Sequence, residues 1–408
     1  MTTKAQAAPL ADVKKETEFS QEEEFQTGQV LTIVGGHFTH DTFSAFVSPL
    51  LPLIIERLSL SLAMAGSLWG FLQLPAILNP FIGYLADKLS VRYFVILAPA
   101  VTATLLSSLG FASSYFVLAV MLLVAGVSVA AFHAPAPAMI ARLSGDRLGK
   151  GMSLFMAGGE LGRTVGPLLA VWVVSLWTMD GFYRIMVLGW LASLILYWRL
   201  KDIPARPEAR QNWREFWPMA RRLFVPILAV MAPREFMLTA LMVYLPTFMK
   251  LEGASLWIAG ASLSIWELAG IGGALTSGTL SDKLGRKKVL LVMILASSVL
   301  MLAFLNSSGW WLVPVLLALG FTALSATPVL LAMVQEHLPR NRAMANGLFL
   351  AMSFLLRPAM AFIIGAVGDS FGLRTAFLWA AFASFLSVPM IYFLPQLKGE
   401  SAGERISE

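Results

Sequence analysis

Long apolar stretches, separated by short polar breaks, recur along almost the whole chain. A helix of about 20 apolar residues crosses a hydrocarbon core about 30 Å thick. We therefore predict twelve transmembrane helices, at roughly 28–55, 61–85, 93–112, 115–140, 152–177, 182–199, 223–249, 255–280, 288–306, 310–334, 343–367 and 375–394. One long polar connection, 200–222, predicts a linker between two six-helix halves, 28–199 and 223–395.

Composition supports a membrane protein over a soluble one. Hydrophobic residues make up 57% of the chain and charged residues 13%, against about 25% charged in a typical soluble domain. The chain has no cysteine, which excludes disulfides, thiolate metal sites and cysteine nucleophiles. The net charge of +6 comes from basic residues in short loops, a placement that reflects membrane topology. We expect a lipid bilayer around the protein and no nucleic-acid partner.

The distribution of basic residues predicts the orientation. Of the 30 Lys and Arg residues, 23 lie in the terminal tails and in the loops predicted to share their side, and the opposite loops hold only four: Arg57, Arg184, Lys250 and Arg374. Cytoplasmic loops carry this excess. We expect a bacterial-type inner membrane protein whose tails, 1–27 and 396–408, are both cytoplasmic. The first tail lacks the apolar core of a signal peptide.

A short motif occurs twice, after the second predicted helix of each half. The first copy reads GYLADKLSVR at 83–92 and the second GTLSDKLGRKK at 278–288. Their aspartates are 195 positions apart, close to half the chain. The residues that we predict to form gating loops are Gly83, Asp87, Lys88, Arg92, Gly278, Asp282, Lys283, Gly285 and Arg286.

This repeat resembles the loop motif of the major facilitator superfamily, G-x-x-x-D-R/K-x-G-R-R/K. The second copy matches it fully, and the first departs at Ser90 and Val91. The resemblance implies an all-α membrane fold of two pseudo-symmetric six-helix bundles. It also implies a substrate site near the midplane between the halves and transport by alternating access. At the membrane edge, the two loop aspartates can pair with cations or helix N-termini and so control opening.

A second motif lies in the fifth predicted helix. The segment AGGELGRTVGP at 157–167 is similar to the antiporter motif G-x-x-x-G-P, and with AFH at 131–133 and MSLFM at 152–156 it resembles fosmidomycin-resistance-type efflux carriers. That resemblance implies exchange of a drug for protons. Glycines at every fourth position let two helices approach closely, a pattern that purely structural helix pairs also show. The motif residues are Gly158, Gly162, Gly166 and Pro167.

Ionisable side chains inside predicted helices are the candidate functional residues, because charges in the membrane are costly and usually serve function. A shift of 194 positions places His40-Asp41 on Arg234-Glu235 and Arg163 on Arg357. The duplicated chain thus predicts a charged site in each half. The full set is His37, His40, Asp41, His133, Glu160, Arg163, Arg234, Glu235, Glu267 and Arg357.

Residue chemistry suggests a role for each candidate. Carboxylates and histidines can carry protons, so the proton-coupling candidates are Asp41, Glu235, Glu267, His37 and His40. Guanidinium binds carboxylate or phosphonate through two parallel hydrogen bonds, so the substrate-binding candidates are Arg163, Arg234 and Arg357, with Glu160 and His133 beside them. Structural ion pairs, such as Glu160 with Arg163, are the alternative interpretation.

These patterns predict a secondary transporter, functional as a monomer, that exports a small, anionic, drug-like compound or metabolite in exchange for protons. An uptake symporter for an organic anion is the nearest alternative. A channel or a membrane-embedded enzyme is a more remote one, because the chain shows gating loops and lacks a nucleophile–base motif or a nucleotide loop. We expect no cofactor and no metal ion.

Overall fold

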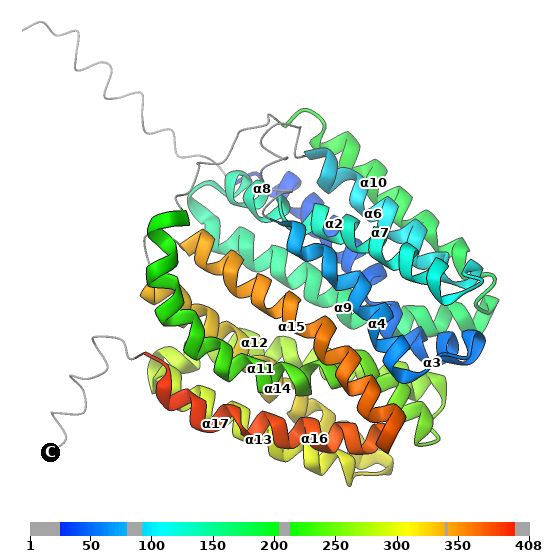
Figure 1. The fold of residues 1–408 in the computed structure, drawn as a ribbon. Helices are drawn as coiled ribbons and strands as arrows, with labels where there is room; N and C mark the ends of the chain where they lie inside the picture. The colour runs from blue at the N-terminus through cyan, green and yellow to red at the C-terminus, as the bar shows by residue number, and fades with distance from the viewer. Residues whose placement is uncertain (1–24, 80–91, 204–212, 339–341, 396–408) are drawn as a thin grey trace, which may run out of the picture.

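The computed structural model describes residues 25–79, 92–203, 213–338 and 342–395, in which the chain forms helices joined by short turns (Figure 1). The elements of the first half are α2 (Thr27–Ser44), α3 (Val47–Leu58), α4 (Leu62–Gln73), η1 (Leu74–Leu78), α6 (Arg92–Ser107), η2 (Leu109–Phe111), α7 (Tyr115–His133), α8 (Ala136–Leu143), η3 (Gly145–Arg147), α9 (Leu148–Trp177), η4 (Phe182–Ile185) and α10 (Met186–Leu200).

The second half follows the same alternation of long helices and short turns. Its elements are α11 (Trp213–Leu251), α12 (Leu256–Leu284), α13 (Arg286–Leu305), η5 (Gly309–Trp311), α14 (Leu312–His337), α15 (Arg342–Phe371), α16 (Leu373–Phe385), α17 (Ser387–Met390) and η6 (Ile391–Phe393). Among the described residues, eight helical segments are long and apolar enough to cross a membrane, and α4 with η1 and α6 are shorter apolar helices.

Three predicted helices are interrupted. The first divides into α2 and α3 at residues 45–46, the fourth into α7 and α8 at residues 134–135, and the twelfth into α16 and α17 at residue 386. Proline lies at or shortly after each break, at Pro49, Pro135 and Pro389, and proline lacks the N–H that continues a helix. Conversely, α11 begins at Trp213, inside the predicted linker 200–222. The linker itself stays a prediction, because residues 204–212 lie outside the described part.

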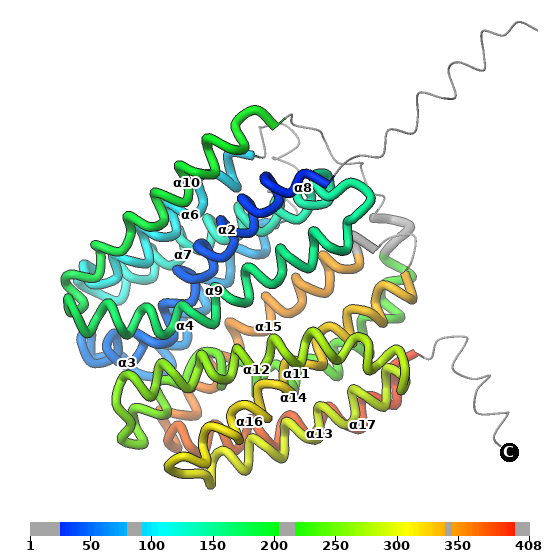
Figure 2. Tube along the Cα trace, turned by 180° about the vertical axis from the view of Figure 1, so that it is seen from behind, coloured from blue at the N-terminus to red at the C-terminus, as the bar shows by residue number. Residues whose placement is uncertain are grey.

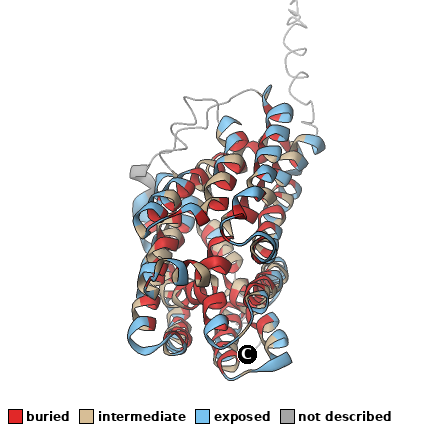
Figure 3. Cartoon of the chain, turned by 90° about the vertical axis from the view of Figure 1, so that its right-hand side faces the viewer, coloured by how far each residue is buried: buried red, intermediate tan, exposed pale blue. Residues whose placement is uncertain are grey.

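The two sets of helices form two adjacent bundles, seen from opposite sides in Figures 1 and 2. We call the end of the molecule with α8 and α17 the near end. The far end holds the turns from α3 to α4 and from α15 to α16. Buried residues line the inner helix faces and exposed residues the outer faces (Figure 3), as expected for helices whose outer surface faces lipid.

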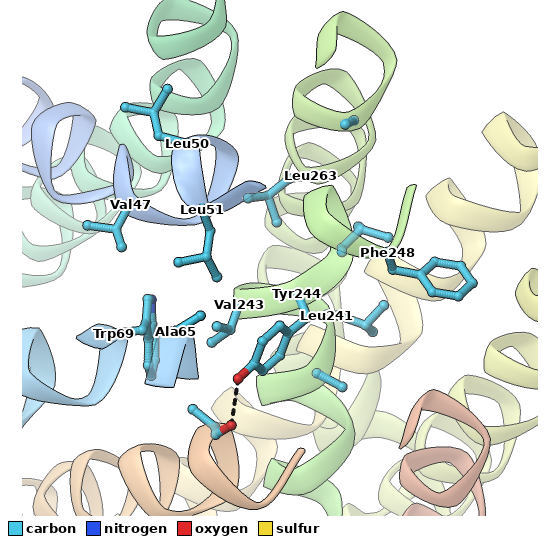
Figure 4. Close-up of a cluster of buried hydrophobic side chains, with 14 of the residues drawn as sticks. Val47, Leu50, Leu51, Ala65, Trp69, Leu241, Val243, Tyr244, Phe248 and Leu263 are labelled. Carbon is cyan, nitrogen blue, oxygen red and sulfur yellow. Dashed lines mark hydrogen bonds between the residues drawn. The ribbon is translucent and has the colours of Figure 1, made fainter. Parts of the chain in front are cut away.

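The hydrophobic core differs between the two ends. One buried cluster includes residues of both halves, among them Leu51 of α3, Trp69 of α4 and Val243 of α11 (Figure 4). Two further clusters each belong to one half: Val30, Phe132 and Leu200 are in the first, and Phe224, Leu290 and Ile391 in the second. Each of these two clusters includes residues close to one end of the described chain, and both of these ends lie at the near end. Within the described residues, the halves therefore share a core toward the far end and have separate cores toward the near end.

Polar contacts also join the halves at the far end. Asp369, near the end of α15, accepts hydrogen bonds from the backbone N–H groups of Leu62 (2.7 Å) and Ala63 (2.9 Å) at the start of α4. The Tyr244 hydroxyl lies 2.8 Å from two carbonyl oxygens, those of Leu62 and Ala361, and Figure 4 shows one of these two contacts. A carboxylate at a helix N-terminus satisfies otherwise unpaired N–H groups. We call these interactions of Asp369 and Tyr244 the far-end contact.

Candidate functional site

The side chains of two histidines and one aspartate lie close together in the first half. His37 and Asp41 lie one turn apart on α2, and His133 ends α7. His37 Nε2 lies 3.4 Å from Asp41 Oδ2 and 3.3 Å from His133 Nε2, which is itself 3.3 Å from Asp41 Oδ1. His37 and Asp41 are buried, and the His133 side chain is 32% exposed. We call these three residues the histidine–aspartate cluster.

Backbone carbonyls fix both imidazoles of this cluster. His37 Nδ1 lies 2.8 Å from the carbonyl oxygen of Phe155, and His133 Nδ1 lies 3.0 Å from that of Val129. A carbonyl oxygen can only accept, so each Nδ1 carries the hydrogen. In a neutral imidazole this leaves Nε2 with a lone pair. Each neutral imidazole of the cluster therefore presents the lone pair of Nε2 toward Asp41, and each charged one donates its Nε2 hydrogen there.

An arginine and a second acid of α9 lie beside the cluster. Arg163 Nη1 is 3.6 Å from Asp41 Oδ2, and Arg163 Nη2 forms a short ion pair with Glu160, one turn earlier. The Arg163 side chain is 37% exposed. The predicted Glu160–Arg163 ion pair is thus present, and Arg163 still has an exposed surface.

The glycine motif explains how α9 comes so close to α2. A Cβ atom added at Gly162 would lie 2.4 Å from the carbonyl oxygen of Phe38, and one at Gly166 would lie 2.6 Å from that of Thr42. Gly158 packs in the same way against Val34. Real Cβ atoms do not approach oxygen so closely, so larger residues here would push the helices apart. The close packing places Arg163 beside Asp41.

The second half carries a cluster of two arginines and one glutamate. Glu235 Oε1 lies 3.3 Å from Arg234 Nη1, and Glu235 Oε2 accepts a 3.0 Å hydrogen bond from Arg357 Nε. Arg234 also donates to the carbonyl of Ala323 and the hydroxyl of Thr327, both at 2.8 Å. Arg234 and Glu235 are buried, whereas the Arg357 side chain is 19% exposed. We call Arg234, Glu235 and Arg357 the arginine–glutamate cluster.

The two clusters occupy equivalent positions of the repeat but differ in chemistry. Each half places its arginine, Arg163 or Arg357, beside its own acid, Asp41 or Glu235. The other partners of Asp41 are imidazoles, which gain and lose protons near neutral pH. Both partners of Glu235 are guanidinium groups, which stay charged. The halves therefore share a geometry, and only the first combines it with histidine.

Glu267 and His40 lie apart from these pairs. Glu267, on α12, is buried, and its electrostatic neighbours include Arg163, Glu160 and Asp41 of the first half and Arg357 of the second. Among the described residues it has no ion pair within 4 Å. His40 is fully buried and stacks on Phe132, and neither of its ring nitrogens has a hydrogen-bond partner in the described part of the chain.

The first predicted gating loop is only partly described. Gly83, Asp87 and Lys88 lie outside the described residues. Arg92 donates a 2.5 Å hydrogen bond to the carbonyl of Ile203 and its guanidinium lies 5.2 Å from the ring centre of Tyr93. Arg92 therefore connects the start of α6 to the end of α10 within the first half.

The second predicted loop is the turn between α12 and α13, with Gly278, Asp282, Lys283, Gly285 and Arg286. Gly285 has φ +93°, a conformation that favours glycine, between the two helices. Asp282 pairs with Arg286, which also lies 2.7 Å from Glu336 of α14. These contacts stay within the second half, so in this conformation the loop connects three helices of one bundle.

Sequence reasoning missed three features of the site. It did not identify Glu336 as a partner of Arg286, it did not identify the far-end contact, and it did not join His133 to His37 and Asp41. The i, i+4 spacing indicated the pair on α2, but contacts between distant helices leave no spacing pattern. An acid at the end of a predicted transmembrane helix, Asp369, was the one available signal for the far-end contact.

A match to a family model assigns the chain to a protein superfamily. The model of the Major Facilitator Superfamily matches residues 33–284 and 271–407. The chain belongs to the major facilitator superfamily. This confirms the predicted fold class and the prediction of a multi-pass membrane transporter rather than an enzyme, because the family and the relatives described next are transporters.

Relatives within the superfamily include resistance proteins. The fosmidomycin resistance protein of Escherichia coli K12 is 26% identical over 88% of this chain and 90% of its own length. The multidrug resistance protein MdtG of Dickeya zeae is 25% identical over 92% of this chain and 95% of its own length. The predicted resemblance to fosmidomycin-resistance-type carriers is therefore confirmed.

Solved structures show the same fold. A D-xylose–proton symporter superposes with a TM-score of 0.72 at 18% identity, covering 92% of this chain and 99% of that one. A bacterial homologue of the human lysosomal transporter Spinster superposes with a TM-score of 0.73 at 16% identity, covering 91% and 97%. At these identities the likeness concerns the fold alone.

Proposed function

We propose that this major facilitator protein exports a small organic anion in exchange for protons, by alternating access. The observation that carries the proposal is the pair Arg163 and Arg357. They occupy equivalent positions of the repeat, one in each half, and both are partly exposed beside a buried acid. Two cations on facing halves can bind one anion between them.

Both arginines keep hydrogen-bond donors for such a ligand. A guanidinium has five N–H donors, and the contacts of Arg357 among the described residues use only its Nε. Arg163 uses Nη2 on Glu160 and lies 3.6 Å from Asp41 through Nη1. A carboxylate or phosphonate binds such donors through paired, charge-assisted hydrogen bonds. Arg234 is buried and uses its donors on Glu235, Ala323 and Thr327, so we assign it a structural role.

We assign the coupling proton to Glu267. A coupling group must experience a different environment in the two conformations of the cycle. Glu267 belongs to the second half, but Arg163, Glu160 and Asp41 of the first half are among its electrostatic neighbours. Motion of one half against the other would change that environment. Glu235, in contrast, is held by arginines of its own half, which would move with it.

The core supports a rocking motion of the halves. The shared core and the far-end contact close the far end in this conformation. The alternative conformation would have to break these contacts and bring the near-end cores together. By the distribution of basic residues, we place the near end, where the first and last described residues lie, in the cytoplasm of a bacterial-type inner membrane, and we expect both tails there. Both halves of the proposed site belong to one chain, so we expect a functional monomer.

The names of the relatives, which refer to resistance, support export. Uptake by symport is the second candidate, and one electrostatic feature of the site supports it. Glu267 and the transported anion would both interact with Arg163 and Arg357, so a proton on Glu267 would leave more positive charge for the anion. Proton and anion would then bind together, which is the requirement for symport.

The direction of a proton gradient distinguishes the two functions in proteoliposomes. With fosmidomycin as the first probe, antiport predicts accumulation when the lumen is more acidic than the medium. Symport predicts accumulation when the medium is more acidic. Accumulation that is equal with and without either gradient would contradict proton coupling altogether.

Arginine variants test the anion site. Loss of a charge-assisted hydrogen bond costs about 1.5–3 kcal/mol, or roughly a 10- to 150-fold loss of affinity. We expect Arg163→Gln and Arg357→Gln to weaken the binding of anionic probes by this amount and that of neutral probes of similar size much less. Arg57→Gln is the matched control, because Arg57 is an exposed arginine paired with Asp180. Equal losses for anionic and neutral probes would contradict the proposed role.

A further inference from the structure

We propose that the histidine–aspartate cluster of His37, Asp41 and His133 is a binding site for one divalent transition-metal ion of the Zn²⁺ class. The inference goes beyond the proposed function, which assigns the transported anion to two arginines and the proton to Glu267. It departs from the expectation, drawn from the sequence, of no metal ion. One oxygen or nitrogen atom from each residue lies within 4.8 Å of the other two.

The distances match tetrahedral coordination. Imidazole nitrogen and carboxylate oxygen bind Zn²⁺ at about 2.0–2.1 Å, so two ligands of a tetrahedral ion lie about 3.3–3.4 Å apart. The two Nε2 atoms are 3.3 Å apart, and each lies close to a different oxygen of the Asp41 carboxylate, His37 Nε2 at 3.4 Å from Oδ2 and His133 Nε2 at 3.3 Å from Oδ1. The two imidazoles are therefore separated as two ligands of one tetrahedral ion, and the carboxylate beside them can supply the third ligand.

The ligand atoms also have the electronic state that a metal requires. Because the Nδ1 hydrogen of each histidine points to a carbonyl oxygen, Nε2 is the nitrogen that supplies a lone pair to a metal when the imidazole is neutral. Nδ1 bonded to a backbone carbonyl is the usual outer-shell arrangement of metal-binding histidine. Asp41 Oδ1 is buried and has no hydrogen-bond partner of ordinary geometry among the described residues. With both imidazoles neutral, two nitrogen lone pairs and one carboxylate face one another, and a cation between them would stabilise the arrangement.

Charge and space around the cluster fit a divalent cation. Arg163 has ion contacts to Asp41 and Glu160, so the acids beside the cluster carry one negative charge more than this arginine. A cation bound at the cluster would offset this negative charge. Arg163 forms its short ion pair with Glu160, and at 3.6 Å it does not make a close hydrogen bond to Asp41. A Cβ atom at Gly159 would lie 2.6 Å from His37 Nε2, so only glycine leaves the site open.

The donor set selects the class of metal. Two imidazoles and one carboxylate suit Zn²⁺, Co²⁺ and Ni²⁺, whereas Mg²⁺ and Ca²⁺ prefer oxygen ligands. Three protein ligands leave a fourth position for water or another small ligand. The exposed part of His133 provides the route of entry. All three ligands belong to the first half, so the ion would stay with that half during transport.

Cobalt binding to the purified full chain tests the site. The protein is prepared without a histidine tag and freed of metal with a chelator, and Co²⁺ is then added. We expect one Co²⁺ per chain, seen by the visible absorption of four- or five-coordinate cobalt, and its displacement by an equal amount of Zn²⁺. An excess of Mg²⁺ should leave the absorption unchanged. Absence of the cobalt band, or its displacement by Mg²⁺, would overturn the proposal.

Variants locate the ion within the chain. His133→Gln and Asp41→Asn should weaken Co²⁺ binding by more than the roughly 10- to 100-fold that loss of an outer-shell partner costs. Because Asp41 is buried and its variant can fail to fold, the partly exposed His133 provides the decisive variant. His337→Gln, a histidine of α14 outside the cluster, should bind Co²⁺ like the parent. Unchanged binding by His133→Gln, or loss of binding in His337→Gln, would place the ion elsewhere and refute the proposed site.

Discussion

Replacement of Asp369 by alanine should open the far end of the transporter. Its carboxylate accepts hydrogen bonds of 2.7 and 2.9 Å from the first two N–H groups of α4, and so joins the end of α15 to the other half. Alanine removes both acceptors and leaves the N–H groups to water. The substitution therefore weakens the sealed conformation and leaves the packing within each half intact.

The size of the effect follows from helix capping. Loss of a capping side chain costs about 0.5–2 kcal/mol, typically about 1 kcal/mol. The sealed conformation would lose this stabilisation, whereas a conformation open at the far end would not. The population of the open conformation should rise about 5-fold, within a range of roughly 2- to 30-fold.

A single cysteine reports this opening, because the natural chain has none. Leu51 is fully buried in the core shared by the halves (Figure 4), so a cysteine at position 51 reacts with a thiol reagent only when the far end opens. When opening is fast, the labelling rate is proportional to the open population. We expect Asp369→Ala to raise the rate in the Leu51→Cys background about 5-fold.

Asp180→Ala is the matched control. It removes an exposed aspartate at the far end whose partner, Arg57 at 2.7 Å, belongs to the same half. Its labelling rate should equal that of the parent. If Asp369→Ala leaves the rate unchanged, or if Asp180→Ala raises it as much, Asp369 does not join the halves as described.

Three further substitutions test other parts of the structure. Tyr244→Phe removes the hydroxyl of the far-end contact and should raise the labelling rate of the same cysteine about 2- to 12-fold, from a hydrogen-bond contribution of about 0.5–1.5 kcal/mol; an unchanged rate would show that the hydroxyl is not needed for closure. Gly162→Ala should lower the melting temperature in detergent, because overpacking costs about 1–3 kcal/mol. Gly149→Ala on the same helix, which has open space around it, should leave the melting temperature unchanged. Equal melting temperatures for the two variants would refute the close approach of α9 and α2. Glu235→Gln leaves the charges of its two arginines uncompensated and should destabilise the protein by about 3–5 kcal/mol in denaturant unfolding, and a loss below 1 kcal/mol would contradict a buried ion cluster.

The sequence predicted the helices well, because hydrophobic runs and breaks depend on local composition. It did not predict the interruption at residues 45–46 or the early start of α11 at Trp213. Both features depend on how the helix packs against its neighbours. An apolar stretch of sequence looks the same whether or not its backbone leaves helical geometry at one point. The polar residues of 213–222 resemble a linker, although they continue a helix.

The charged residues of each site were also predictable, and their partners only in part. The repeat offset related Arg163 to Arg357 and Asp41 to Glu235, because duplication preserves positions along the chain. It could not place His133 beside Asp41, since the two are on different helices and their separation in sequence carries no distance information. The repeat offset also could not show that Asp41 and Glu235 have different further partners, because these contacts depend on the directions of side chains from other helices.

Transport by a Glu267→Gln variant tests whether Glu267 carries the coupling proton. The measurement compares proton-gradient-driven accumulation of the probe with exchange of labelled for unlabelled probe in the same proteoliposomes. We expect gradient-driven accumulation to be lost while exchange continues, because glutamine keeps the shape of the side chain and cannot carry the proton. Gradient-driven accumulation at the parental rate would contradict the assignment of proton coupling to Glu267.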